Sequence, residues 1–325
     1  MTTVLTSPFP MQPMQRDKWV TDRRPGRTAV DPYLPYAFLV EEECSAELEV
    51  VSVATVFLTN RECPWRCVMC DLWKNTLTDK VPLGAIPIQI EHALARMPPA
   101  RQIKLYNSGS FFDLQAIPKE DYAAIAEKVG SFERTIVECH PSLVSERCLE
   151  FRDILPNQLE VAMGLETAQP AVLDRLNKKM TLEQFSNAAS YLSENQIDLR
   201  VFILVQPPFM QPEESLYWAQ RSLDFAFDCG ATAVTLIPTR GGNGAMESLA
   251  LSGEFTPPNI STVEEAASYG LCQRRGRVFV DLWDMANRQD TCRDCLADRV
   301  TRLQHMNLHQ RSIPTVHCSN CGGQS

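Results

Sequence analysis

Three cysteines lie close together in one short segment, Cys63, Cys67 and Cys70, with the spacing C-x3-C-x2-C. Three thiolates at this spacing can bind three irons of a [4Fe-4S] cubane and leave the fourth iron without a protein ligand. Such an open iron can bind a small molecule, whereas a fully ligated cluster only transfers electrons. We therefore expect these cysteines to hold a [4Fe-4S] cluster that takes part in chemistry. The alternatives are a zinc site that lacks its usual fourth ligand or three ordinary thiols.

A second group of cysteines lies near the end of the sequence. Cys292 and Cys295 form one C-x2-C pair, and Cys318 and Cys321 form another after twenty-two intervening residues. Four thiolates suit a closed tetrahedral zinc site, which would fold a tail too short to have a large core of its own. A second iron-sulfur cluster is the alternative, because four cysteines also bind such clusters. The remaining cysteines are expected to be structural thiols: Cys44, Cys139, Cys148, Cys229 and Cys272.

The composition is that of an ordinary globular protein, with 325 residues of which 44% are hydrophobic and 22% are charged. The net charge of −9 counts against unassisted binding of nucleic acid, because affinity for phosphates comes largely from Lys and Arg. No apolar run approaches the roughly 18 residues of a membrane span, and the first residues lack a signal-peptide core. We therefore expect a cytoplasmic protein with no membrane partner, in which the cysteines stay reduced.

Short β-branched runs alternate with longer helical segments between residues 51 and 240, which predicts a parallel sheet with crossover helices. The predicted strands are Val51–Leu58, Gln102–Tyr106, Arg134–Val137, Leu159–Gly164, Leu199–Val205 and Ala233–Ile237. The predicted helices are Ile88–Arg96, Lys119–Val129, Ser142–Asp153, Thr181–Asn195 and Pro212–Cys229. The order suits a doubly wound sheet or a partial (β/α) barrel. In both folds the functional groups gather beyond the carboxyl ends of the strands.

These elements divide the chain into four expected parts. Residues 1–50 form an irregular N-terminal extension, and residues 51–240 form the core. Residues 241–285 connect the core to the tail, beginning at a glycine-rich run and containing one further strand candidate at Arg277–Leu282. Residues 286–325 form the four-cysteine metal-binding tail.

Polar residues recur where the predicted strands end. The small residues Ser108, Gly109 and Ser110 follow the second strand, and small residues let a backbone approach a ligand closely. Glu138 and Glu166 follow the third and fourth strands. A carboxylate at such a position can accept hydrogen bonds from ribose hydroxyls, and otherwise caps a helix or lies on the surface.

Three further polar residues, His140, Arg200 and Arg240, invite a catalytic or anion-binding role. A histidine directly before a proline is more often simply hydrogen-bonded, and isolated arginines are usually ion-paired or on the surface. We assign none of the three to the site.

The cysteine segment resembles the signature of the radical S-adenosylmethionine (SAM) superfamily. The resemblance implies an α/β fold, a partial (β/α)6 barrel with the cluster loop after its first strand. It implies that the open iron binds the amino and carboxylate groups of SAM and cleaves it to a 5′-deoxyadenosyl radical that abstracts hydrogen from a substrate. Ser108, Gly109 and Ser110 would then bind the methionine amino group, and Glu138 or Glu166 the ribose. An external one-electron donor is required.

Five further stretches, NSGSFFD, ECHP, GLET, LNKKMTLEQF and VQPPF, are similar to radical SAM proteins related to the archaeosine synthase radical SAM subunit and, more distantly, to the elongator catalytic subunit. This likeness covers about residues 50–240 and implies a tRNA nucleoside as substrate. Two other functions stay open: an adaptor with an iron-sulfur or zinc-ribbon structure and no catalysis, and an electron-transfer protein. Retained cleavage of SAM distinguishes the enzyme from both.

Overall fold

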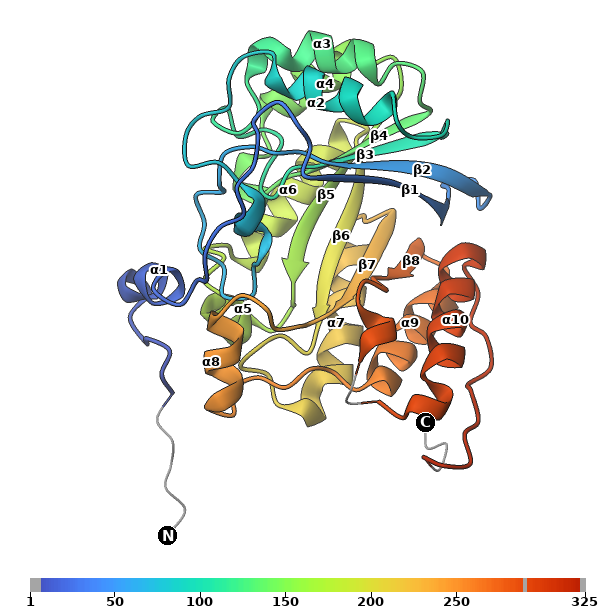
Figure 1. Cartoon of the computed structure of the whole chain (residues 1–325). Coiled ribbons are helices and arrows are strands. Elements are labelled where there is room, and N and C mark those ends of the chain that lie inside the picture. The colour runs from blue at the N-terminus through green and yellow to red at the C-terminus, as the bar shows by residue number, and fades with distance from the viewer. Residues whose placement is uncertain (1–6, 289–290, 322–325) are drawn as a thin grey trace.

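One eight-stranded sheet, with the strand order β1 to β8, organises the computed structural model of the chain (Figure 1). The structure describes residues 7–288 and 291–321. Residues 1–6 of the expected extension, and residues 289–290 and 322–325 of the expected tail, lie outside the described residues. The strands are β1 Ala37–Cys44, β2 Val50–Phe57, β3 Gln102–Tyr106, β4 Arg134–Glu138, β5 Gln158–Glu166, β6 Asp198–Val205, β7 Ala233–Pro238 and β8 Arg277–Val280.

Strands β2 to β8 are parallel, and each pairs with the strand that follows it in the sequence. The sheet curls into a half-barrel, which confirms the expected partial barrel and its six core strands as β2 to β7. Parallel strands buried on both faces are rich in β-branched residues, and this is the pattern from which they were predicted. All carboxyl ends of the parallel strands therefore meet at one rim.

Helices lie outside the curled sheet and bury its convex face (Figure 1). The α-helices are α1 Pro13–Thr21, α2 Ala85–Leu94, α3 Tyr122–Lys128, α4 Glu146–Ile154, α5 Pro170–Arg175, α6 Leu182–Glu194, α7 Ser215–Asp228, α8 Ala245–Leu251, α9 Ile260–Gln273 and α10 Arg293–His309. The five predicted helices correspond to α2, α3, α4, α6 and α7. Helix α6 begins at a capping box, in which Thr181 and Gln184 exchange hydrogen bonds. No helix in the described ranges is long and apolar enough to cross a membrane.

The expectation of an irregular N-terminal extension is wrong for two segments, because this part of the chain contains α1 and β1. Strand β1 pairs antiparallel with β2 and extends the sheet by one edge strand. The sequence does not predict this strand, because three consecutive glutamates follow Val40. Glu41 and Glu43 are tolerated there because both form ion pairs with the buried Lys104. The other edge strand, β8, corresponds to the strand candidate of the predicted connecting segment.

A buried network of charges fills the amino end of the half-barrel. Glu160 accepts from Arg200 at 2.6 Å, from Arg277 at 3.1 Å and from Arg134 at 3.2 Å. Burial by itself would raise the pKa of Glu160, but the three arginines lower it to about 2. Arg200 also pairs with Glu43 at 2.6 Å, so it is an ion-paired residue as expected and lies away from the rim. Paired charges of this kind are costly to disrupt singly.

Helix α10 protects the exposed edge of β8. The side-chain amide of Asn307 accepts from the backbone of Val280 and donates back to it, each at 2.8 Å. Gln310 does the same at Val278, at 2.7 and 3.0 Å. These four bonds replace those that a ninth strand would make, and an edge covered in this way cannot pair with another chain.

Candidate cluster and cofactor site

The three-cysteine loop follows β2 directly and lies at the carboxyl rim, where the sequence predicts it. Val68, between the second and third cysteines, is fully buried, and its backbone N–H donates to Leu176 at 2.9 Å. The side chain of Asn243 donates to the carbonyls of Val68 at 2.7 Å and Cys70 at 3.1 Å. Two segments far along the chain therefore fix the backbone of the loop.

The N-terminal arm supports the outer side of the same loop. Glu62, one residue before the first cysteine, pairs with Arg24 at 2.6 Å and with Arg66 at 3.1 Å, and it also pairs with Arg27. Val68 packs in a small apolar core that includes Trp19 of α1 and residues of α8. The arm thus holds the cysteine loop on the side away from the sheet.

The loop after β3 lies against the first cysteine. A Cβ atom placed on Gly109 would lie 3.3 Å from the Cβ of Cys63, so a larger residue would crowd the cysteine loop. Ser108 adopts a left-handed conformation with φ of 52°, and its hydroxyl lies 3.3 Å from the hydroxyl of Tyr36. The hydroxyl of Ser110 donates to the Cys139 thiol at 3.4 Å. The structure brings this loop and the cysteines together, and what the loop binds stays a prediction.

Glu138, at the end of β4, organises the loop after β3. Its carboxylate accepts from the backbone N–H of Asn107 at 2.9 Å, and it also interacts with the backbone of Ser108. Burial raises the pKa of Glu138 to about 7, although both backbone bonds and Lys178 oppose this rise. A carboxyl group half protonated near neutral pH at this position links the geometry of the loop to pH.

Glu166, at the end of β5, forms a buried ion pair with Lys178. The side chain of Glu166 is 10% exposed and that of Lys178 is 9% exposed. Glu166 has φ of 68°, a conformation that L-residues rarely adopt and that the surrounding structure must stabilise. A Cβ atom on Gly164 would overlap the carboxylate of Glu166 and the ammonium of Lys178, so a larger residue there would displace the ends of these two side chains.

His140 is occupied by structural contacts. Its ring stacks on Trp65 of the cysteine loop with centroids 3.7 Å apart. Its Nε2–H donates to the carbonyl of Lys178 at 3.1 Å, and Nδ1 faces the hydroxyl of Ser142 at 2.8 Å. Burial and the nearby Lys178 charge lower the pKa of His140 to about 3. The neutral imidazole therefore positions the cysteine loop, in agreement with the expectation that it is hydrogen-bonded.

The environment of the three thiols favours their protonated forms in the absence of metal. Burial raises the pKa of Cys63 to about 12 and that of Cys70 to about 11, and it raises the pKa of Cys67 still further. Iron would therefore have to displace the thiol protons. Both polar atoms of the buried Asn107 side chain, and the Thr59 hydroxyl, have no partner in the protein. Polar groups left unpaired beside three thiols match a site that receives a polar ligand.

The C-terminal cysteines form a compact quartet. The sulfur atoms of Cys292, Cys295, Cys318 and Cys321 all lie within 4.8 Å of one another. The sulfur atoms of Cys292 and Cys318 are 3.9 Å apart, and those of Cys295 and Cys321 are 3.7 Å apart. A tetrahedral zinc ion bound at its usual distance spaces thiolates by about 3.8 Å. A cubane spaces them more widely, because each thiolate binds a different iron. The quartet therefore fits one metal ion.

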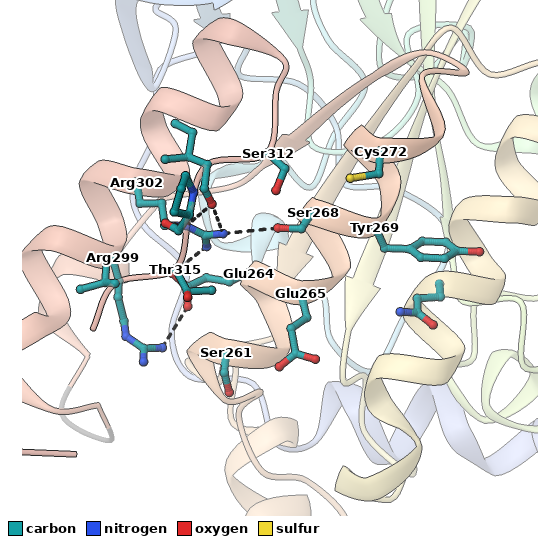
Figure 2. Close-up of a pocket in the computed structure, with 14 residues that line it drawn as sticks. Ser261, Glu264, Glu265, Ser268, Tyr269, Cys272, Arg299, Arg302, Ser312 and Thr315 are labelled. Atoms are coloured by element: carbon teal, nitrogen blue, oxygen red, sulfur yellow. Dashed lines mark hydrogen bonds and ion pairs between the residues drawn. The ribbon is translucent and has the colours of Figure 1, made fainter. Parts of the chain in front are cut away.

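Buried ion pairs dock the tail that carries the quartet (Figure 2). Glu264 of α9 pairs with Arg299 at 2.9 Å and with Arg302 at 3.0 Å, both from α10. Arg302 also donates to the carbonyls of Ile313 and Pro314, which holds the returning segment. These groups line a cavity of about 740 Å³ between α9, α10 and the tail. The contacts place the quartet beside the barrel, where α10 packs on β1 and β8.

Sequence analysis missed several residues that hold the site. Asn243 lies in the glycine-rich run that marks the end of the predicted core, and Lys178 lies in the stretch LNKKMTLEQF. The glycine run and the family-like stretch do not by themselves predict contacts to the cysteine loop. Their contacts to the cysteine loop depend on chain segments more than a hundred residues away. Arg240, which was left unassigned, pairs with Asp281 at 3.2 Å.

Comparisons with known proteins agree with this geometry. Residues 57–214 match the family model described as the radical SAM superfamily. The chain is 22% identical over 255 residues to an uncharacterized protein of Methanocaldococcus jannaschii, covering 74% of this chain and 70% of that protein. It is 27% identical over 227 residues to archaeosine synthase subunit beta of Methanosarcina acetivorans, covering 65% of this chain and 64% of that subunit.

A solved structure supports the fold alone. The archaeal Elp3 of Methanocaldococcus infernus, with residues 1–46 deleted, superposes with a TM-score of 0.50 and 15% identity, over 68% of this chain and 58% of that one. The family model begins at the last residue of β2, just before the cysteine loop, and ends at the start of α7. Residues 57–214, just under half of the chain, therefore match a radical SAM domain.

Proposed function

We propose that Cys63, Cys67 and Cys70 hold the [4Fe-4S] cluster that the radical SAM family implies, and that SAM binds at its open iron. The observation that carries this proposal is the contact between the cysteine loop and the loop containing Gly109 at the carboxyl rim. When bound, the cluster supplies one electron that cleaves SAM to a 5′-deoxyadenosyl radical. An external one-electron donor must supply that electron.

The residues around the loop bind and orient the cofactor. Ser108, Gly109 and Ser110 receive the methionine end of SAM, because small residues leave their backbone accessible. Glu138 keeps this loop in place through the backbone of Asn107. Glu166 offers its second carboxylate oxygen to the ribose hydroxyls while Lys178 neutralises its charge. Val68 packs in the small apolar core and Trp65 stacks on His140, and both contacts fix the cysteine loop.

The substrate in this proposal is a tRNA nucleoside. Similarity to archaeosine synthase subunit beta supports this class, because that name concerns a modified tRNA nucleoside. The net charge of −9 means that an RNA would have to be bound through a local basic surface. The radical SAM domain also argues against the two non-catalytic alternatives, which have no need of an open iron.

The quartet of Cys292, Cys295, Cys318 and Cys321 binds one zinc ion in this proposal. Sulfur separations of 3.7 and 3.9 Å support a single metal over a second cluster. With four thiolates the ion has no open position, so its role is structural. Zinc binding would stabilise the tail and the attachment of α10 to β8.

The first test is cleavage of SAM. The protein is reconstituted with iron and sulfide without oxygen, reduced with dithionite and assayed for 5′-deoxyadenosine, in parallel with Cys67→Ala and the control Cys272→Ala, an exposed thiol on α9. The proposal expects product in the intact protein and in the control, and at least a hundredfold less in Cys67→Ala. A protein that forms its cluster but yields no product would support a structural or electron-transfer role.

The second test concerns the substrate. Nucleosides from the tRNA of cells that lack the protein are compared by mass spectrometry with those of the parent strain. A modification that disappears, and returns with the intact gene but not with Cys67→Ala, supports the tRNA nucleoside. An unchanged nucleoside profile contradicts it and leaves SAM cleavage unaffected.

A further inference from the structure

Lys178 is a buried cation held against the cysteine loop. Three consecutive residues fix it there: Leu176 accepts from the backbone of Val68 at 2.9 Å, and Asn177 donates to the carbonyl of Arg66 at 2.8 Å. The carbonyl of Lys178 itself accepts from His140 at 3.1 Å, and His140 stacks on Trp65. The backbone position of Lys178 is thus coupled to the loop at three points.

The ammonium group has one direct partner, Glu166, and its charge acts on several groups of the site. Burial by itself lowers the pKa of Lys178, but Glu166 and the thiolate forms of Cys67 and Cys63 raise it above its ordinary value. In turn, Lys178 favours the ionised forms of both cysteines. The glycine at position 164 leaves room for the pair, since any side chain there would overlap it.

Charge near a cluster decides how easily the cluster is reduced. A [4Fe-4S] core with three thiolates gains one further negative charge on reduction, and a nearby cation stabilises the reduced state. The interaction is strong where water is excluded, because the local dielectric constant is low. A buried ammonium, carried by a segment that is hydrogen-bonded to the cysteine loop, is placed to have this effect, and a buried carboxylate has the opposite effect.

We propose that Lys178 is a positioning residue that raises the reduction potential of the cluster, and that Glu166 holds its ammonium in place and partly offsets its charge. This inference rests on the proposed cluster at Cys63, Cys67 and Cys70. The reduction itself takes one electron from a low-potential donor and involves no proton. The pair therefore sets the potential that a donor must reach.

The experiment is a potentiometric titration of the reconstituted protein with dithionite, followed by electron paramagnetic resonance in the absence of SAM. Lys178→Met should shift the equilibrium between reduced and oxidised cluster at least tenfold toward the oxidised form, or about 59 mV for one electron. Glu166→Gln should shift it in the opposite direction, because this variant removes an anion. Lys178→Arg should restore a potential close to that of the unaltered protein.

The opposite signs separate this proposal from a merely structural role. Loss of structure would disturb Lys178→Met and Glu166→Gln alike, so shifts of the same sign, or no shift, overturn the proposal. Lys179→Met is the matched control, because that neighbouring side chain is 46% exposed and pairs with Asp17. If Lys178→Met does not retain iron, the sign of the shift in reduction potential in Glu166→Gln decides between the proposal and a structural role. Failure of the unaltered protein to form a cluster would instead contradict the proposed function.

Discussion

The two cysteine groups of this protein use the same ligand type in different surroundings. The quartet brings four sulfur atoms within 4.8 Å of one another, from one C-x2-C pair at the start of α10 and a second pair that follows this helix. Cys63, Cys67 and Cys70 share one loop, and residues from the N-terminal arm, from the segment around Lys178 and from Asn243 hold that loop. The quartet offers four thiols, whereas the first group offers three thiols on a loop that several distant segments hold in place.

This difference indicates what each centre is for. A complete tetrahedral set has no vacant position, so the metal can only stabilise structure. In the proposed function, the three-ligand centre would leave one iron open, and the surrounding residues would position another molecule there. The four predictions below separate the two centres, beginning with the largest expected effect.

Cys295→Ser should remove the metal from the quartet and leave the first centre intact. Structural zinc sites supply on the order of 10 kcal/mol of binding free energy, which is lost with a ligand. Zinc per chain should fall from one to none by elemental analysis, and amide exchange should increase in α10 and β8. Iron content and 5′-deoxyadenosine formation should change little. Loss of iron as well would show that the two centres are not independent.

Glu264→Gln should lower the free energy of unfolding by a smaller amount, because it weakens the attachment of the tail. The substitution leaves Arg299 and Arg302 buried with a neutral partner, and breaking a buried ion pair in this way costs about 3–5 kcal/mol. Urea unfolding would measure the loss. The half-buried neighbour Glu265 provides the control, because Glu265→Gln should change the free energy of unfolding by less than about 0.5 kcal/mol. Equal effects of both variants would contradict a role for the buried pair.

Gly164→Ala should affect the first centre instead. The added methyl group would overlap both members of the Glu166–Lys178 pair, and overpacking of this kind costs about 1–3 kcal/mol. Reduced iron retention after reconstitution, with zinc content unchanged, is the expected result. Gly26→Ala serves as the control, since nothing lies within 4 Å of its added carbon. Iron retention equal to that of the control would show that the pair tolerates displacement.

Glu138→Gln should flatten the pH dependence of stability. The pKa of this carboxyl is about 7 in the folded protein, above its ordinary value of 4.5, so the folded state binds more protons between these pH values. Unfolding free energy therefore falls as pH rises from about 4.5 to 7, by at most about 1.4 kcal/mol per pH unit. Glu138→Gln should remove this fall, measured by urea unfolding from pH 4 to 8. The exposed Glu127→Gln should leave it in place.

Much of the sheet was predictable because its strands are buried on both faces. Strand β3 coincides with the predicted Gln102–Tyr106, and the cysteine loop follows the first parallel strand as expected. Strand β1 was missed because its glutamates read as solvent-exposed, although Lys104 and Arg200 compensate them inside the protein. Helix α10 was missed because its cysteines and charges mask its apolar positions.

The sequence by itself determined the two groups of cysteines, their spacing along the chain and the place of the first group after a strand, since these are local properties. The resemblance of its motifs to the radical SAM superfamily agrees with the family match. Only the tertiary structure decided that Asn243 and Asn177 hold the cysteine loop and that Glu138 holds the loop after β3. Burial and electrostatic pairing depend on segments that meet only when the chain folds. The residues adjacent in sequence to a cysteine therefore do not predict its surroundings in the folded protein.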